Sequence, residues 1–216
     1  MPVFVTFEGV EGSGKSTQMA LAAKWLEGQG LSVLTTRQPG GCPLGLELRR
    51  ILLDAANTDV HPVAELFMYL ADRAQHVAQV IQPALNQGRI VLCDRYHDST
   101  VAYQGFGRGL EVASLLDLGR VACLGLAPDA TLLLDLPAAQ GLARARGRNL
   151  ENGTHDSEGR FEALELDFHE RVRQGYLTLA RREPERYAVI EAGADPQTVA
   201  DRVGQALAAR LRRANP

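Results

Sequence analysis

The stretch FEGVEGSGKST, residues 7–17, decides the fold of this 216-residue chain. Four residues separate Gly9 from the run Gly14, Lys15 and Ser16, which is the spacing of a loop that cradles phosphates. A short apolar run precedes the glycines directly, and helical periodicity begins at Lys15. A chance match lacks this framing, so the stretch predicts a nucleotide-binding loop between a strand and a helix.

Each part of this loop has an expected chemical role. Backbone amides at the positive end of the helix would hold the phosphates, while Lys15 would reach the terminal phosphates and Ser16 would ligate Mg²⁺. The simpler alternative, a glycine-rich turn that merely joins a strand to a helix, does not explain the GKS run. The residues predicted to bind the nucleotide are Gly9, Val10, Glu11, Gly12, Ser13, Gly14, Lys15, Ser16 and Thr17. Glu11 is unexpected among them, because the loop otherwise attracts anions.

Short apolar runs alternate with long stretches of helical periodicity along the chain. Near-continuous apolar character is typical of parallel strands that are covered by helices on both faces. The predicted strands are 3–8, 31–36, 89–94, 130–136 and 187–191, and the predicted helices are 15–28, 62–87, 161–182 and 196–212. We therefore predict an α/β protein with a five-stranded parallel sheet flanked by helices, in a single domain over residues 1–216.

Composition argues against several classes of protein. The net charge is −3 and no basic stripe is visible, so a nucleic-acid partner is not expected. No apolar run approaches the roughly 20 residues of a membrane span, and the N-terminus lacks a signal-peptide pattern, so we expect a cytoplasmic protein without a membrane partner. The three cysteines are widely spaced, which favours free thiols over a disulfide framework or a structural zinc site.

A second set of candidates follows the third predicted strand. Asp94 and Arg95 come where this strand ends, and ligand crevices of open α/β sheets lie beyond the carboxyl ends of the strands. Tyr69 and Arg73 are four residues apart and share one helix face, where a ring and a guanidinium suit a planar base and a phosphate. Periodicity alone favours the simpler alternatives, a core aromatic at Tyr69 and a paired surface charge at Arg73.

The segment from Arg146 to Gly159 interrupts the regular pattern with glycine, asparagine and charged residues. It is either a solvated loop or a catalytic lid over the phosphate site. The chain lacks the NKxD stretch with which a regulatory GTPase reads guanine, so a kinase or a small ATPase is favoured.

Six segments have a characteristic order: FEGVEGSGKST, TRQPGG, LADRAQHV, DRYHDSTVAYQG, RARGR and GRFE. In this order and spacing, over nearly the whole chain, they resemble the thymidylate kinase family, whose members phosphorylate dTMP to dTDP with ATP. The resemblance implies the three-layer P-loop kinase fold and Mg²⁺ as the cofactor. It also implies ATP and dTMP as partners, and a homodimer formed through long helices such as 62–87.

The resemblance implies individual roles as well. Arg37, Arg73 and Arg95 would hold the dTMP phosphate, and Glu11 would face its 3′-hydroxyl. Tyr69 stands where most relatives have a phenylalanine that stacks on thymine. The residues implied to bind dTMP are Glu11, Arg37, Tyr69, Arg73, Arg95, Ser99, Thr100, Tyr103 and Gln104. Within this set, Thr100 and Gln104 would meet the edge of the base, and Tyr103 would lie against the deoxyribose.

Catalytic charge is expected from outside the phosphate loop, because Gly12 and Ser13 after Glu11 are not basic. Similar bacterial enzymes use arginines of a lid, here at about 144–160, and Arg144 is a further candidate there. The catalytic residues implied are Lys15, Asp94, Arg95, Arg146, Arg148 and Arg160, and the metal ligands are Ser16 and Asp94. Two rival functions remain: a small kinase with another acceptor, and a nucleotide-binding module without turnover.

Overall fold

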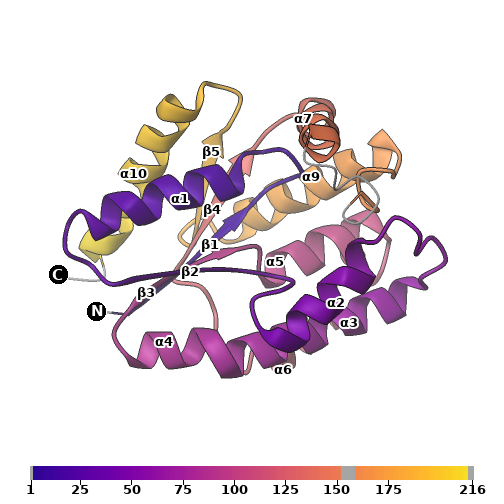
Figure 1. Cartoon of the computed structure of the whole chain (residues 1–216), viewed down its shortest axis with the longest axis horizontal. Coiled ribbons are helices and arrows are strands. Elements are labelled where there is room, and N and C mark those ends of the chain that lie inside the picture. Colours follow the sequence, from indigo (N-terminus) through magenta and orange to yellow (C-terminus); the bar gives the residue numbers. More distant parts are fainter. Residues whose placement is uncertain (1, 152–158, 214–216) are drawn as a thin grey trace.

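The computed structural model describes residues 2–151 and 159–213. Its centre is a parallel sheet with the order β2-β3-β1-β4-β5 (Figure 1). The strands are β1 (Val3–Glu8), β2 (Val33–Arg37), β3 (Ile90–Asp94), β4 (Ala130–Asp135) and β5 (Tyr187–Glu191). The predicted class and the five parallel strands are confirmed, with boundaries that differ by at most two residues.

Helices cover both faces of the sheet. The α-helices are α1 (Lys15–Glu27), α2 (Pro43–Leu53), α3 (Pro62–His76), α4 (Gln82–Asn86), α5 (His97–Thr100), α6 (Val112–Ala122), α7 (Ala138–Glu151), α9 (Leu166–Arg182) and α10 (Pro196–Arg213). Two π-helical segments, η1 (Val77–Ile81) and η2 (Val101–Gly107), continue α3 and α5. Helices α1 and α10 pack together on one face, while α4 and α9 contact the strands from the other (Figure 1). In the described part of the chain, no helix is long and apolar enough to cross a membrane.

Position in the sheet explains the apolar pattern of each strand. β1 lies in the middle of the sheet and all of its residues are buried, so it reads as a continuous apolar run. β2 lies at an edge, and burial alternates along it. Leu26 of α1, Val172 of α9 and Val203 of α10 join the strand residues in the main core.

Two sequence-based boundaries are wrong. The helix predicted at 161–182 begins at Leu166, because the preceding residues form a turn in which the ring of Phe161 packs edge-on against Tyr103. Residues 146–151, predicted to be irregular, continue α7, whose apolar positions Leu142 and Ala145 are buried. Residues 152–158 of the predicted lid lie outside the described residues. Helices α2, α6 and α7 are not among the predicted helices.

The parallel register brings the functional ends of the strands to one edge. Asp94 at the end of β3 pairs with Phe7 of β1 on one side and with Arg37 of β2 on the other. Glu8, one residue beyond Phe7, therefore lies at the same edge. Beyond Asp94 the chain turns at Arg95, which has a φ of 69° and donates its backbone N–H to the carbonyl of Phe7.

Candidate active site

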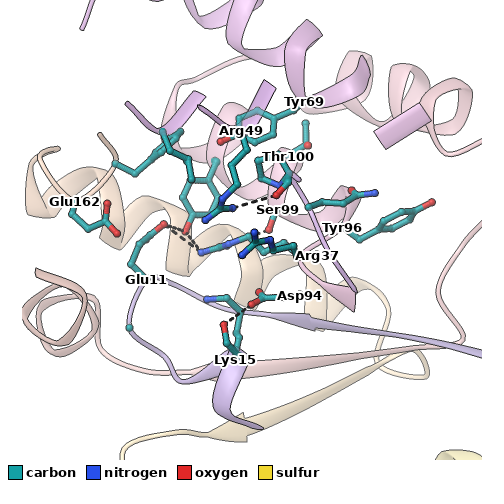
Figure 2. Close-up of a pocket in the computed structure, with 18 of the residues that line it drawn as sticks. Glu11, Lys15, Arg37, Arg49, Tyr69, Asp94, Tyr96, Ser99, Thr100 and Glu162 are labelled. Carbon is teal, nitrogen blue, oxygen red and sulfur yellow. Dashed lines mark hydrogen bonds and ion pairs between the residues drawn. The ribbon is translucent and has the colours of Figure 1, made fainter. Parts of the chain in front are cut away.

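A cavity of about 360 Å³ lies at this edge of the sheet. Figure 2 shows Lys15 and Asp94 at one end of it and Tyr69 and Arg49 at the other, with Arg37 between them. The predicted residues that line it are Glu11, Gly12, Gly14, Lys15, Ser16, Thr17, Arg37, Tyr69, Arg73, Asp94, Arg95, Ser99, Thr100, Tyr103, Gln104 and Arg148. The predicted residues Gly9, Val10, Ser13, Arg146 and Arg160 lie around it without lining it.

The phosphate loop has the backbone that its glycines allow. Gly12 and Gly14 have φ values of 67° and 91°, which other residues rarely adopt, and Gly14 caps α1. The first-turn amides of α1 have no acceptors within the helix, so they are available to a phosphate. Lys15 is buried, and its Nζ donates to the carbonyls of Gly9 and Val10 at 3.0 and 2.8 Å.

The burial of Lys15 changes its acidity. Desolvation and the positive charge of Arg95 lower the pKa of the amine to about 8, although Asp94, Glu11 and Glu8 act in the opposite direction. A polyanion bound at the loop would favour the ammonium form. Lys15 therefore has electrostatic free energy to gain from phosphate binding.

Ser16 and Asp94 meet at the same end of the cavity. The hydroxyl of Ser16 donates to Asp94 Oδ2 at 2.8 Å. A hydroxyl and a carboxylate are hard oxygen donors of the kind that Mg²⁺ prefers, and Mg²⁺ usually completes its shell with substrate phosphates and water. Within the described residues no cluster of three or more His, Cys, Asp or Glu side chains could hold a metal.

Glu11 projects from the loop into a network of donors. Its Oε1 accepts from the hydroxyl of Tyr103 and lies 3.3 Å from Arg95 Nη2, while Oε2 lies 3.3 Å from His169 Nδ1. Burial alone would raise the pKa of Glu11. The adjacent His169 ring and the charges of Arg95 and Lys15 outweigh it and hold that pKa well below its usual range.

Arg95 is held by several partners at once. Nη1 donates to Ser99 Oγ at 3.2 Å and to the hydroxyl of Tyr176 at 3.0 Å, and Nη2 donates to the hydroxyl of Tyr103 at 2.9 Å. The guanidinium also lies 4.9 Å from the centre of the Tyr103 ring. This fork is fixed in place before any ligand arrives, which lowers the cost of ordering it on binding.

Glu8 accepts hydrogen bonds from Ser99 and Tyr176, two of the residues that hold Arg95. Its carboxylate is fully buried and accepts from the backbone of Tyr96 at 2.7 Å, from Ser99 Oγ at 2.6 Å and from the Tyr176 hydroxyl at 2.9 Å. Burial and the nearby charge of Asp98 raise the pKa of Glu8. Glu8 was not predicted as a site residue. Its position at the end of the central strand is the sequence feature that could have identified it.

Arg73 is enclosed by protein acceptors. It is 1 % exposed, and it donates to Gln38 Oε1 at 2.9 Å, to Thr100 Oγ1 at 2.8 Å and to the carbonyl of Tyr96 at 3.0 Å. Thr100 also lines the cavity, so Arg73 fixes a residue expected to meet the base. Contact of Arg73 with the phosphate stays a prediction.

The arginines of the predicted lid occupy different positions. Gly12 and Gly141 approach so closely that a Cβ on Gly141 would lie 2.3 Å from the carbonyl oxygen of Glu11, so α7 packs directly on the loop. This packing brings Arg148 to the cavity. Arg146 instead donates to the backbone carbonyl of Glu162 at 2.7 and 3.0 Å.

Arg160 is buried outside the cavity, with Nη2 2.8 Å from Glu65 Oε2. Further cavity residues came only from the structure. Arg49, Leu53, Phe161 and Glu162 also line the cavity. Phe161 and Glu162 belong to the GRFE segment, but no individual role was predicted for either of them, whereas Arg49 and Leu53 belong to no motif.

A phosphate loop after the central strand of a parallel sheet, facing an arginine-rich cavity, defines a P-loop nucleotide phosphotransferase. Comparison with known proteins narrows this class. The family model described as thymidylate kinase matches residues 7–203. The thymidylate kinase of Solidesulfovibrio magneticus is 59 % identical over 93 % of this chain and 96 % of its own.

The thymidylate kinase of Nitratidesulfovibrio vulgaris strain DP4 is 56 % identical over 97 % of this chain and 93 % of its own length. The crystal structure of thymidylate kinase from Ehrlichia chaffeensis matches with a TM-score of 0.75 and 32 % identity, and covers 95 % of this chain and 98 % of that one. The chain belongs to the thymidylate kinase family. The family predicted from the sequence motifs, and with it a kinase, is confirmed.

Proposed function

We propose that the protein transfers the terminal phosphoryl group of ATP to dTMP and releases dTDP and ADP. The proposal rests on one observation in this member of the thymidylate kinase family: the phosphate loop and the residues expected to bind dTMP line the same cavity. Lys15 of the phosphate loop and the ring of Tyr69 line one space, with Arg37 between them (Figure 2). Two nucleotides can therefore place their phosphates together.

The chemistry needs charge neutralisation more than proton transfer. A phosphate oxygen of dTMP attacks the terminal phosphorus of ATP, and the bond to the bridging oxygen of ADP breaks. The attacking oxygen is already ionised at neutral pH, since the second pKa of a phosphate monoester is about 6. Arg37 and Arg95 would hold the acceptor phosphate, and Arg148 would meet the charge that moves between the two nucleotides.

The opposite end of the cavity would receive the thymidine. Tyr69 would stack on the base, and Thr100 and Gln104 would meet its edge. Tyr103 would lie against the sugar, where its hydroxyl is already held by Glu11 and Arg95. The assignment follows the family resemblance, and all four residues line the cavity.

Mg²⁺ would be held by Ser16 and Asp94 together with phosphate oxygens, since the two side chains offer the oxygen donors this ion prefers. Bound there, the ion supplies positive charge at the reacting phosphates.

We also propose one kinase domain over residues 1–216, and a cytoplasmic location, which suits the three free, buried cysteines.

The proposal is tested by measuring ADP release with Mg-ATP and dTMP, dUMP, dCMP, AMP or no acceptor. A strong preference for dTMP is expected. Turnover that prefers another acceptor would contradict the assignment of the base site. ATP binding without any acceptor-dependent turnover would support the nucleotide-binding module instead.

Replacing Glu11 with Gln is expected to lower kcat/KM for dTMP by about 10- to 100-fold and to leave KM for ATP within twofold. The carboxylate would accept from the sugar 3′-hydroxyl, and a hydrogen bond to a charged group contributes roughly 1.5–3 kcal/mol. The defect should shrink with 3′-deoxythymidine monophosphate, which lacks that hydroxyl. Glu27→Gln, at the exposed end of α1, serves as the control. Unchanged dTMP kinetics in E11Q would exclude this role.

We propose a homodimer formed through α3 and its neighbours α2 and α6, which pack against it. These helices expose large apolar side chains, and exposed apolar surface of this kind marks interfaces. The side chains concerned are Leu44, Leu46, Val63, Phe67, Leu116 and Val121.

Replacing Phe67, which is 56 % exposed, with Asp is expected to convert the dimer to a monomer, because a desolvated carboxylate would face the partner. Sedimentation velocity measures the change. Val189→Asp, at an equally exposed position on β5, should remain dimeric. A wild-type monomer, or a dimeric F67D, would refute this interface.

A further inference from the structure

A buried acid on α3, one turn before Tyr69, belongs to none of the roles above. Glu65 is fully buried, and its two oxygens have different partners. Oε2 accepts from Arg108 Nη2 at 3.0 Å and lies 2.8 Å from Arg160 Nη2. Oε1 accepts from Gln104 Nε2 at 2.9 Å, and from Arg108 Nε at a longer 3.3 Å.

The contact with Glu65 decides which way the Gln104 amide points. A carboxylate offers only acceptors, so the side of the amide that meets Glu65 must be the NH₂ group. The oxygen of Gln104 is then left on the other branch of the amide. Gln104 is 1 % exposed and lines the cavity, so the branch of the amide that does not meet Glu65 faces the cavity.

We infer that Glu65 is a specificity-determining positioning residue, which fixes the Gln104 amide with its oxygen toward the base. This inference rests on the proposed place of Gln104 at the base edge. An oxygen there accepts from the N3–H of thymine or uracil. Cytosine presents a bare N3, whose lone pair faces the same oxygen without a proton between them. Glu65 therefore favours dTMP and dUMP over dCMP and does not separate the first two.

The two arginines make the substitution Glu65→Gln informative. Arg108 and Arg160 are donors only, so the amide oxygen of the variant stays with them at the Oε2 position. Its NH₂ group then takes the Oε1 position, where it gives up the longer contact with Arg108 Nε and faces Gln104. Gln104 must turn over to accept from it, and so presents its own NH₂ group to the base. The site then suits cytosine.

The test measures kcat/KM for dTMP, dUMP and dCMP at saturating Mg-ATP in the wild type and in E65Q. The ratio of dTMP to dCMP is expected to fall by about 10- to 100-fold in E65Q, the effect of a mispaired buried polar group. The values for dTMP and dUMP should fall together, while that for dCMP holds or rises. KM for ATP should not change. Glu47→Gln, an exposed acid on α2, should behave as the wild type.

Two further variants separate the possible outcomes. Gln104→Leu removes the reading group and should abolish most of the preference; if it does not, the place of Gln104 at the base is wrong and the inference falls with it. If Q104L behaves as expected but E65Q lowers dTMP and dCMP turnover equally, Glu65 is only structural. Should E65Q fail to fold, Glu65→Asp keeps a carboxylate for both arginines but withdraws it from Gln104. A smaller fall in the same ratio is expected, and an unchanged ratio overturns the inference.

Discussion

Replacing Lys15 with Met is expected to lower kcat by about 10²- to 10³-fold, the cost of removing one preorganised charge from a developing anion. Lys15 lies at the loop that receives the phosphates, and its Nζ is held there by the carbonyls of Gly9 and Val10. ADP release at saturating dTMP measures the change. Full activity in K15M would exclude the proposed role of the loop.

Two controls show that the defect in K15M is electrostatic. The pKa of Lys15 is lowered to about 8, so burial of its charge destabilises the fold below pH 8 and the penalty fades as pH rises from there toward the unfolded value. The thermal midpoint of K15M at pH 7 should therefore match or exceed that of the wild type. In the wild type, the affinity for ATP should weaken as pH rises through about 8, because the neutral amine cannot pair with phosphate. K15M should lack this trend.

Replacing Arg95 with Met is expected to lower kcat/KM for dTMP by about 10³-fold, at the lower end of the range known for arginines that stabilise transferring phosphoryl groups. The fork is oriented by Tyr103, Ser99 and Tyr176 before substrate arrives. Its loss also removes the guanidinium that lies 3.3 Å from Glu11 Oε1, so more negative charge remains next to the acceptor phosphate. Initial rates over a range of dTMP concentrations measure the change.

Arg95→Lys distinguishes charge from geometry at this position. Lysine restores a point charge but not the fork, so it should recover only part of the activity lost in R95M. KM for ATP should change less than KM for dTMP in both variants. Equal losses for both substrates would mean that Arg95 supports the whole site rather than the acceptor.

Local chemistry explains why much of this protein was predictable. The glycines of residues 7–17 permit the positive φ values of a phosphate loop, and the continuous apolar runs indicate parallel strands covered on both faces. Asp94 and Arg95 were identified from their place at the end of a strand. The family itself follows from the order of the motifs, and the comparisons confirm it.

Other features depend on contacts that periodicity does not encode. Glu11 meets His169 of α9, and Glu65 meets Arg160, across long intervals of sequence. Only the packing of α7 on the loop separates Arg148, which lines the cavity, from Arg146, which does not.

The sequence by itself thus determined the fold and the phosphate loop, because strand, turn and helix preferences act between neighbouring residues. The tertiary structure alone decided which charges share the cavity and which way Gln104 points. Burial removes water as a competing partner, so each polar group there is oriented by whichever distant side chain the fold brings to it.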